Sequence, residues 1–295
     1  MKKEMHELAA WSLEAAKSAG ADGCRVSINS GRDVQISYRD RKPENIKEAT
    51  TKGLNIEIFV NGRYSSQSTS DLRKEPLQDF IKNAIAMTKL LAEDKFRTLP
   101  DPKYYEGRAE IDLKTVDPNY DALSPEGRHG LAKAIEAEAL SKSGTKVISV
   151  TASAQDGRSE SILMSSNGFE GYSESTYYVS GASVTLQDEG DRKPNGYYYV
   201  VATSEKEMPK PEEVGAKAAQ RTLDLLGGKK IKTATVPIII ENQNVPRLGS
   251  GLVGQTLALA GVISLGLGLY VVMVSQLGIP ELQEIVRYVR KKLSR

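Results

Sequence analysis

Residues 54–68 read LNIEIFVNGRYSSQS and contain the clearest strand and turn signals of the chain. Apolar and polar residues alternate up to Val60, as they do in a strand whose successive side chains point to opposite faces. Asn61 and Gly62 follow, and Asn-Gly is the strongest two-residue signal for a hairpin because a type I′ turn needs positive φ twice. The stretch therefore predicts two antiparallel strands joined by a tight turn.

Helical patterns lie on both sides of this hairpin. Residues 2–19 carry an apolar stripe at helical spacing that ends before Gly20, and Asp71 is the expected N-cap of a second stripe that extends to Leu91. Residues 24–30 and 33–38 alternate around Ser30-Gly31-Arg32 and predict another hairpin, and residues 43–51 could add a strand. A helix, antiparallel strands and a helix predict an α+β unit.

The second half of the chain repeats this mixture. Ser124-Pro125-Glu126 predicts the start of a helix that ends near Gly144, and residues 211–226 predict another. Between them, strands are expected at 147–154, 160–166, 169–180, 182–187 and 197–202, with Asp156-Gly157 and Asn167-Gly168 as turns. Residues 233–240 are largely apolar and predict a buried strand.

These patterns predict an α+β fold in which helices pack on antiparallel sheets in two N-terminal domains. The first is expected at residues 1–105 and the second, richer in strands, at 122–230, joined by a linker at 106–121 within the proline-containing stretch 96–121. Residues 231–255 would begin a third domain, and residues 256–295 would form an apolar helix with a basic amphipathic tail.

Composition excludes several classes of function. Lys and Arg number 40 against 38 Asp and Glu, a net charge of +2, which gives no electrostatic footprint for nucleic acid. The two histidines, His6 and His129, cannot form a site that needs three. The single cysteine, Cys24, allows no intrachain disulfide and fits a reducing compartment; it lies in a predicted strand, where a small buried residue is a better interpretation than a nucleophile.

The order of several short motifs resembles the PmbA/TldD family, and within it the PmbA (TldE) branch. Each motif is weak alone, but their order and spacing are specific, and the resemblance covers roughly residues 1–255. The matching segments are GLNIEIFVNGRY (53–64), STSDL (68–72), LAED (91–94), LPDP (99–102), SNGFEG (166–171), AKAAQRTLDLLG (216–227) and VPIII (236–240).

The catalytic branch of that family carries a His-Glu-x-x-x-His motif on a helix after the strand that resembles VPIII. Two imidazoles on one helical face hold the metal, and the glutamate activates a metal-bound water. Here Ser250 and Gln255 stand at the histidine positions and Gly251 at the glutamate position. The resemblance therefore implies a chain without a catalytic residue, a metal site or a cofactor of its own.

The same resemblance implies a partner. The chain would be the non-catalytic, cytoplasmic subunit of a pair whose TldD-like member holds zinc, and the pair would cleave flexible or unfolded peptides, including modified-peptide precursors. No nucleic acid is expected as a partner. An autonomous hydrolase is the weakest alternative, because no Gly-x-Ser-x-Gly elbow precedes a helix in the right context.

The end of the chain departs from the family pattern, in which the third domain continues further as mostly β structure. No charged residue occurs from Leu248 to Pro280, and the run from Leu257 to Ile279 is long enough to cross a bilayer core. Three interpretations stay open: an end that results from truncation or gene joining, a true membrane anchor, or a buried helix. The anchor would make the chain a membrane-tethered peptide-binding module without enzymatic activity.

Tyrosines cluster in the second domain and are candidates for holding an extended peptide. Tyrosines beside a sheet edge give contact area at low entropy cost, but on a sheet they are more often cross-strand packing pairs. Because side chains alternate, Tyr177 and Tyr178 cannot share a face, nor can Tyr198 share one with its two tyrosine neighbours. The candidate residues are Asn167, Gly168, Tyr177, Tyr178, Tyr197 and Tyr199.

Overall fold

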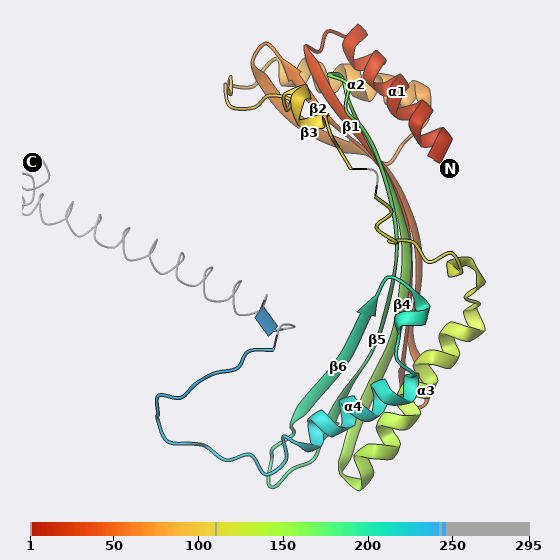
Figure 1. Ribbon diagram of the computed structural model, residues 1–295, viewed down its shortest axis with the longest axis vertical. Helices are drawn as coiled ribbons and strands as arrows, with labels where there is room; N and C mark the ends of the chain where they lie inside the picture. The colour runs from red at the N-terminus through yellow and green to blue at the C-terminus, as the bar shows by residue number, and fades with distance from the viewer. Residues whose placement is uncertain (1, 110, 242–243, 246–295) are drawn as a thin grey trace, which may run out of the picture. The chain divides into compact units, whose positions relative to one another are not determined.

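The computed structural model describes residues 2–109, 111–241 and 244–245. Its contacts divide the chain into two units, Met1–Lys229 and Lys230–Arg295. The first unit contains every strand and every α-helix assigned in the described residues (Figure 1). These are α1 (Lys2–Ser18), β1 (Gly23–Arg39), β2 (Lys42–Val60), β3 (Arg63–Thr69), α2 (Lys74–Thr88), α3 (Pro125–Ser143), β4 (Val147–Ser165), β5 (Glu170–Leu186), β6 (Asn195–Ala202) and α4 (Pro211–Leu223).

The strands form one antiparallel sheet in the order β3-β2-β1-β4-β5-β6. This confirms the α+β class, with helices packed on antiparallel strands. The sheet is single rather than one per half of the chain, because β1 is long enough to pair with β2 on one side and with β4 on the other along nearly its whole length. The domain boundaries expected at residues 105 and 122 stay predictions.

Two expected turns are the middles of long strands. Gly31 in β1 pairs with Thr51 of β2 and Ser159 of β4, and Gly157 in β4 pairs with Asp33 and Tyr177. The turns predicted at Ser30-Gly31-Arg32 and Asp156-Gly157 are therefore wrong, as is the break expected in β5 between residues 180 and 182. Neither Gly31 nor Gly157 has the positive φ of a tight turn.

The turns that do form have left-handed residues. Asn61 and Gly62 have φ of 51° and 69°, and Gly168 has φ of 98°, so the turns at Asn61-Gly62 and Asn167-Gly168 are confirmed. The true β1–β2 turn lies at Asp40 and Arg41, where φ is 53° and 60°. The buried carboxylate of Glu136 on α3 accepts a hydrogen bond from the backbone N–H of Arg41 at 2.9 Å, which fixes this turn.

All four α-helices lie on the same side of the sheet (Figure 1). One pair, α1 and α2, covers apolar side chains of β1 and β2 that include Val26, Ile28 and Ile56. The other pair, α3 and α4, covers β4 and β5 at Val150 and Val184. On β1, β4 and β5, the side chains that face the helices are those of even-numbered residues, so the odd-numbered side chains point to the opposite face.

One of the two predicted helix N-caps, that at Ser124, is confirmed. The Ser124 hydroxyl accepts a hydrogen bond from the N–H of Gly127 at 3.0 Å at the start of α3. The cap expected at Asp71 is wrong, because α2 begins at Lys74 with Arg73 as N-cap. Asp71 instead accepts hydrogen bonds from the backbone and the guanidinium of Arg73, which form a local turn before the helix.

Residues 233–240 form no strand in this structure, so the buried strand predicted there is wrong. Ile238 and Ile239 are 77% and 98% exposed. A lone strand has no partner for its backbone groups, and the described residues supply none. The described helices include none that is both long enough and apolar enough to cross a membrane. The apolar run from Leu257 to Ile279 lies outside the described residues.

Candidate functional site

The face of the sheet opposite the α-helices is built mainly from small and polar side chains. Among the residues that the structure describes, no α-helix covers it. On β1 and β4 its side chains include the apolar Leu163 and, besides it, those of Arg25, Ser27, Asn29, Asp33, Gln35, Ser37, Arg39, Thr151, Ser153, Gln155, Ser159 and Ser161. Three of the candidate tyrosines, Tyr177, Tyr197 and Tyr199, lie on this open face.

Tyr177 is held in a hydrogen-bond network near the centre of the open face. Its hydroxyl donates to the Asp33 carboxylate on β1 and accepts from Gln155 Nε2 at 3.2 Å, and Gln155 Nε2 also donates to Asp33 at 2.9 Å. Burial, followed by the hydrogen bond to Asp33, raises the pKa of Tyr177 to about 12. The hydroxyl of Tyr177 is therefore neutral at physiological pH and can donate its hydrogen bond to Asp33.

Tyr197 and Tyr199 stack on each other on β6, with ring centroids 6.2 Å apart and planes 17° from parallel. Tyr199 lies over Gly181, where an added Cβ would come within 2.8 Å of Tyr199 Cβ. Strand β6 is last in the sheet order, so its outer edge has no strand partner within the described part of the chain. An open edge with aromatic side chains beside it suits an extended peptide.

Tyr178 belongs to the interior on the helix side. It is 4% exposed, and its hydroxyl donates to Asp117 Oδ2 at 3.1 Å. Asp117 also accepts hydrogen bonds from the backbone N–H groups of Asn119 and Glu205 and from the Ser204 hydroxyl. Burial acts to raise the pKa of Asp117, but these hydrogen bonds together lower it below its ordinary value. Tyr178 therefore helps to anchor the segments around residues 117 and 204.

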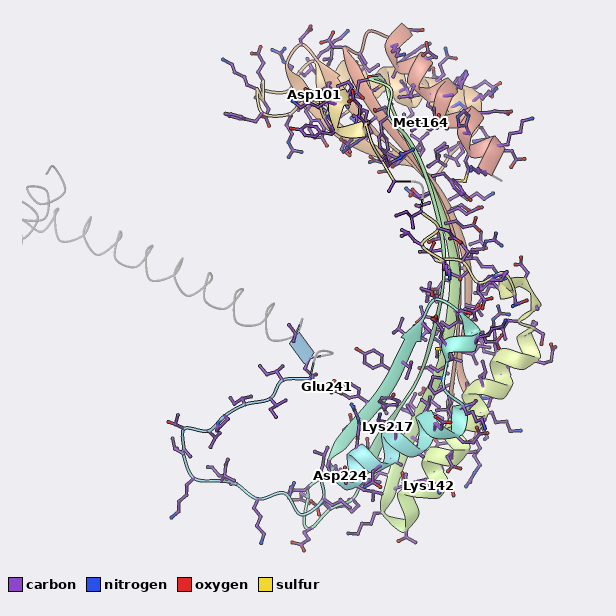
Figure 2. The ribbon with its side chains drawn as sticks, in the orientation of Figure 1. Asp101, Lys142, Met164, Lys217, Asp224 and Glu241 are labelled. Atoms are coloured by element: carbon purple, nitrogen blue, oxygen red, sulfur yellow. The ribbon has the colours of Figure 1, made fainter. Side chains whose placement is uncertain are left out.

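Asn167 holds the segment that precedes α3 rather than facing the tyrosines. Its Nδ2 donates to the Pro100 carbonyl at 2.6 Å, and its Oδ1 accepts from the Tyr105 hydroxyl at 3.1 Å. Figure 2 places Met164, close to this turn, near one end of the sheet and Lys217, which lies 4.6 Å from the Tyr198 ring, near the other. The structure therefore does not bring Asn167 and Gly168 together with Tyr197 and Tyr199.

The residues with catalytic chemistry are scattered. His6 Nε2 is 2.9 Å from Glu170 Oε1, and His129 Nδ1 is 3.1 Å from the Tyr38 hydroxyl. Cys24 is fully buried, and burial raises the pKa of its thiol to about 11, which makes it unreactive. In the described residues no group of three His, Cys, Asp or Glu could hold a metal. Ser250, Gly251 and Gln255 lie outside those residues.

Two family models match the chain in order along its length. PmbA/TldA metallopeptidase domain 1 matches residues 24–88, and the PmbA/TldA metallopeptidase central domain matches residues 118–226. The chain belongs to the PmbA/TldD family. The matched regions share the central strand pair of the sheet, since β1 comes from the first match and β4 from the second.

Curated relatives have the same family name. Metalloprotease PmbA of Escherichia coli O157:H7 is 29% identical over 267 residues, which are 88% of this chain and 56% of the relative. A metalloprotease PmbA homolog of Haemophilus influenzae is 23% identical over 244 residues, 81% of this chain and 52% of the relative. The chain thus spans a little over half the length of these PmbA/TldD relatives.

Solved structures share the fold. A Bacteroides thetaiotaomicron protein, named for a proposed role as a modulator of DNA gyrase, matches with a TM-score of 0.79 and 34% identity over 85% of this chain and 56% of that protein. TldE from Thermococcus kodakarensis matches with a TM-score of 0.62 and 15% identity, over 73% of this chain and 47% of TldE. At that identity the second match shows the fold alone.

Sequence reasoning missed the partners of Tyr177 on the open face. Asp33 and Gln155 had no signal of their own, because both were placed next to turns that do not exist. The strand register shows why they meet. Gln155 pairs with Gln35 on β1 and with Val179 on β5, and Asp33 and Tyr177 lie two residues away from these partners on the same face of the sheet. Knowledge that β1 and β4 are continuous and pair with each other in this register would have brought these side chains together.

Proposed function

We propose that this chain is a PmbA/TldE-like subunit of a TldD/TldE-type metallopeptidase complex and does not carry the metal itself. The observation behind this proposal is the ordered match of both family domains, combined with Ser250, Gly251 and Gln255 at the positions of the metal motif. In this proposal zinc and the catalytic glutamate come from a TldD-like partner. The single unpaired cysteine fits action in the cytoplasm.

The contribution of this chain would be to hold flexible or unfolded peptides. The outer edge of β6 offers backbone groups that pair with any extended peptide, so recognition depends little on the peptide's sequence. Tyr197 and Tyr199 lie on the open face next to that edge and add aromatic contact. Tyr177 lies four residues before Gly181, the partner of Tyr199, or about 13 Å along the strand, within reach of a longer peptide.

Reconstitution tests this proposal. The full chain and a TldD-like protein from the same genome are purified separately and mixed, and cleavage of an unstructured peptide is followed with each protein alone and with both. We expect efficient, chelator-sensitive cleavage only by the mixture. Two proteins that do not co-elute, or a partner whose cleavage rate is unchanged by this chain, would refute the proposed assembly.

A further inference from the structure

A cavity of about 460 Å³ lies on the helix side of the sheet, between the core under α1 and α2 and the core under α3 and α4. Its floor consists of two adjacent rows of side chains that cross β2, β1 and β4 in register: Lys52, Ser30 and Glu160, then Thr50, Arg32 and Arg158. Tyr120 and Asp121 complete the wall. The volume is in the range of sites that hold small molecules.

Most charges in this cavity have a partner of opposite sign. Arg32 lies 2.8 Å from Glu48, and Arg158 is paired with Glu174 and Asp121. Lys52 is the exception among the cations of the lining, because no acidic group pairs with it in the described residues. Within the described part of the chain, Lys52 is therefore the positive charge that the cavity leaves unpaired, at the β2 end of its first row.

The opposite end of that row carries an unsatisfied acceptor. Glu160 is 6% exposed; its Oε1 accepts a hydrogen bond from the Tyr172 hydroxyl at 3.0 Å, whereas its Oε2 is buried and has no donor among the described residues. Leaving a buried carboxylate oxygen without a donor is unfavourable, so such groups point to a missing partner. Two strand spacings, about 9.6 Å, separate the Lys52 and Glu160 backbones, and the Ser30 hydroxyl lies between them.

We propose that this cavity binds a small zwitterion, an amino acid or a short peptide, with its ammonium group on Glu160 and its carboxylate on Lys52. The Glu160 carboxylate turns toward the ligand when it binds, and Ser30 and Thr50 supply neutral hydrogen bonds between the charged ends. This site is separate from the β6 edge and does not depend on the chain being a peptidase subunit.

Calorimetric titration of the full chain with alanine and with Ala-Ala tests the site, and comparing the two separates a free amino acid from a peptide. We expect saturable binding of at least one of them. Acetylation of the amino end, or amidation of the carboxyl end, should each weaken binding about tenfold, because each removes one charge-assisted interaction. Absence of saturable binding of both compounds, or equal binding of the blocked forms, would overturn the proposal.

Variants assign the two ends of the ligand. Glu160→Gln should abolish the preference for a free amino end and leave the preference for a free carboxyl end, and Lys52→Gln should do the reverse. Lys47→Gln is the matched control, since Lys47 lies on the same strand in an exposed position outside the cavity. If Glu160→Gln fails to fold, two tests of the site remain. The blocked ligands can be titrated into the unchanged chain, and Lys52→Gln still tests the preference for a free carboxyl end. Identical preferences in both variants would contradict the assignment.

Discussion

Gly157 supports the placement of Tyr177 on the open face. A Cβ added at Gly157 would lie 2.4 Å from Tyr177 Cε1 and 2.8 Å from the Arg32 carbonyl oxygen, so neither the ring nor the backbone leaves room for it. We expect Gly157→Ala to lower the free energy of unfolding by about 1–3 kcal/mol through overpacking. Urea unfolding measures this change.

The matched control is Gly130→Ala. Gly130 lies in α3 and is exposed, and the described residues place no atom within 4 Å of a Cβ added there, apart from its own neighbours in the helix. Alanine there should raise the free energy of unfolding by about 0.5–1 kcal/mol, because glycine loses more conformational freedom in a helix. Equal effects of the two substitutions would contradict the close approach of Tyr177 to Gly157.

We expect Asp117 to make the stability of the fold sensitive to acid. Its pKa is lowered in the folded state, so its ionised form contributes stability that is present above the ordinary carboxyl pKa and is lost as the pH falls through the lowered value. Asp117→Asn should therefore reduce the melting temperature at pH 7, and the difference from the unchanged chain should shrink as the pH falls below about 4. Thermal melts across this range check the direction, and a difference that grows in acid would be evidence against it.

At the scale of elements, strands were easier to predict than the places where they stop. Asn61-Gly62 and Asn167-Gly168 form turns, since Asn61, Gly62 and Gly168 adopt left-handed φ. Gly31 and Gly157 looked similar locally but lie in mid-strand, and at Gly157 the space is taken by a side chain from the neighbouring strand. The register across three strands distinguishes a glycine in a turn from a glycine in the middle of a strand. The local sequence pattern does not contain that register.

Strand β6 carries tyrosines on both of its faces, so alanine substitutions of tyrosine can compare the role of the open face with that of the helix side. Tyr197 is on the open face, whereas Tyr198 lies on the helix side, 4.6 Å from Lys217 Nζ and 5.0 Å from Arg221 Cζ. We expect Tyr197→Ala to weaken peptide cleavage by the reconstituted pair roughly fivefold with little change in melting temperature. Tyr198→Ala should lower the free energy of unfolding by about 1–3 kcal/mol and leave cleavage per folded molecule unchanged.

Cleavage rate and thermal melting measured together distinguish this account from simple packing. If Tyr197 only packs against its neighbours, its alanine variant loses stability first and cleavage only in proportion to the unfolded fraction. That pattern would remove Tyr197 from the peptide surface. The sequence predicted a peptide surface made of Asn167, Gly168 and a set of tyrosines. The structure was needed to separate Tyr178, which is buried on the helix side, from Tyr177, Tyr197 and Tyr199.

For the whole molecule, the sequence predicted the family and the fold class but not the single sheet. Motif order carried the family assignment, since each segment keeps its place relative to the others. The buried strand at 233–240 was predicted from apolar composition alone, and it fails because Ile239 has no neighbouring strand to cover it among the described residues. Whether an apolar segment is buried depends on the elements that pack against it, and these cannot be inferred from the segment's own sequence.

Removal of residues 256–295 should reduce self-association. The sequence from Leu248 to Pro280 has no charged residue, and an apolar stretch of that length in contact with water drives association. Size-exclusion chromatography of residues 1–255 and of the full chain, both without detergent, makes the comparison. We expect a larger share of the shortened protein to elute as one discrete peak, and a smaller share to elute as aggregate. Greater aggregation after the removal would mean that this stretch belongs to the folded core.

Zinc stoichiometry distinguishes a chain that lacks a metal site from one that holds the metal itself. Native mass spectrometry of the co-expressed pair should detect a complex in which this chain and a TldD-like partner occur together and zinc is retained by the partner. The same chain purified alone and washed with a chelator should hold no zinc and cleave no peptide, because we propose that Ser250, Gly251 and Gln255 stand at the positions of the family's metal motif, where they supply neither imidazole nor carboxylate. Stoichiometric, tightly held zinc on this chain alone, accompanied by chelator-sensitive peptide cleavage, would contradict the account.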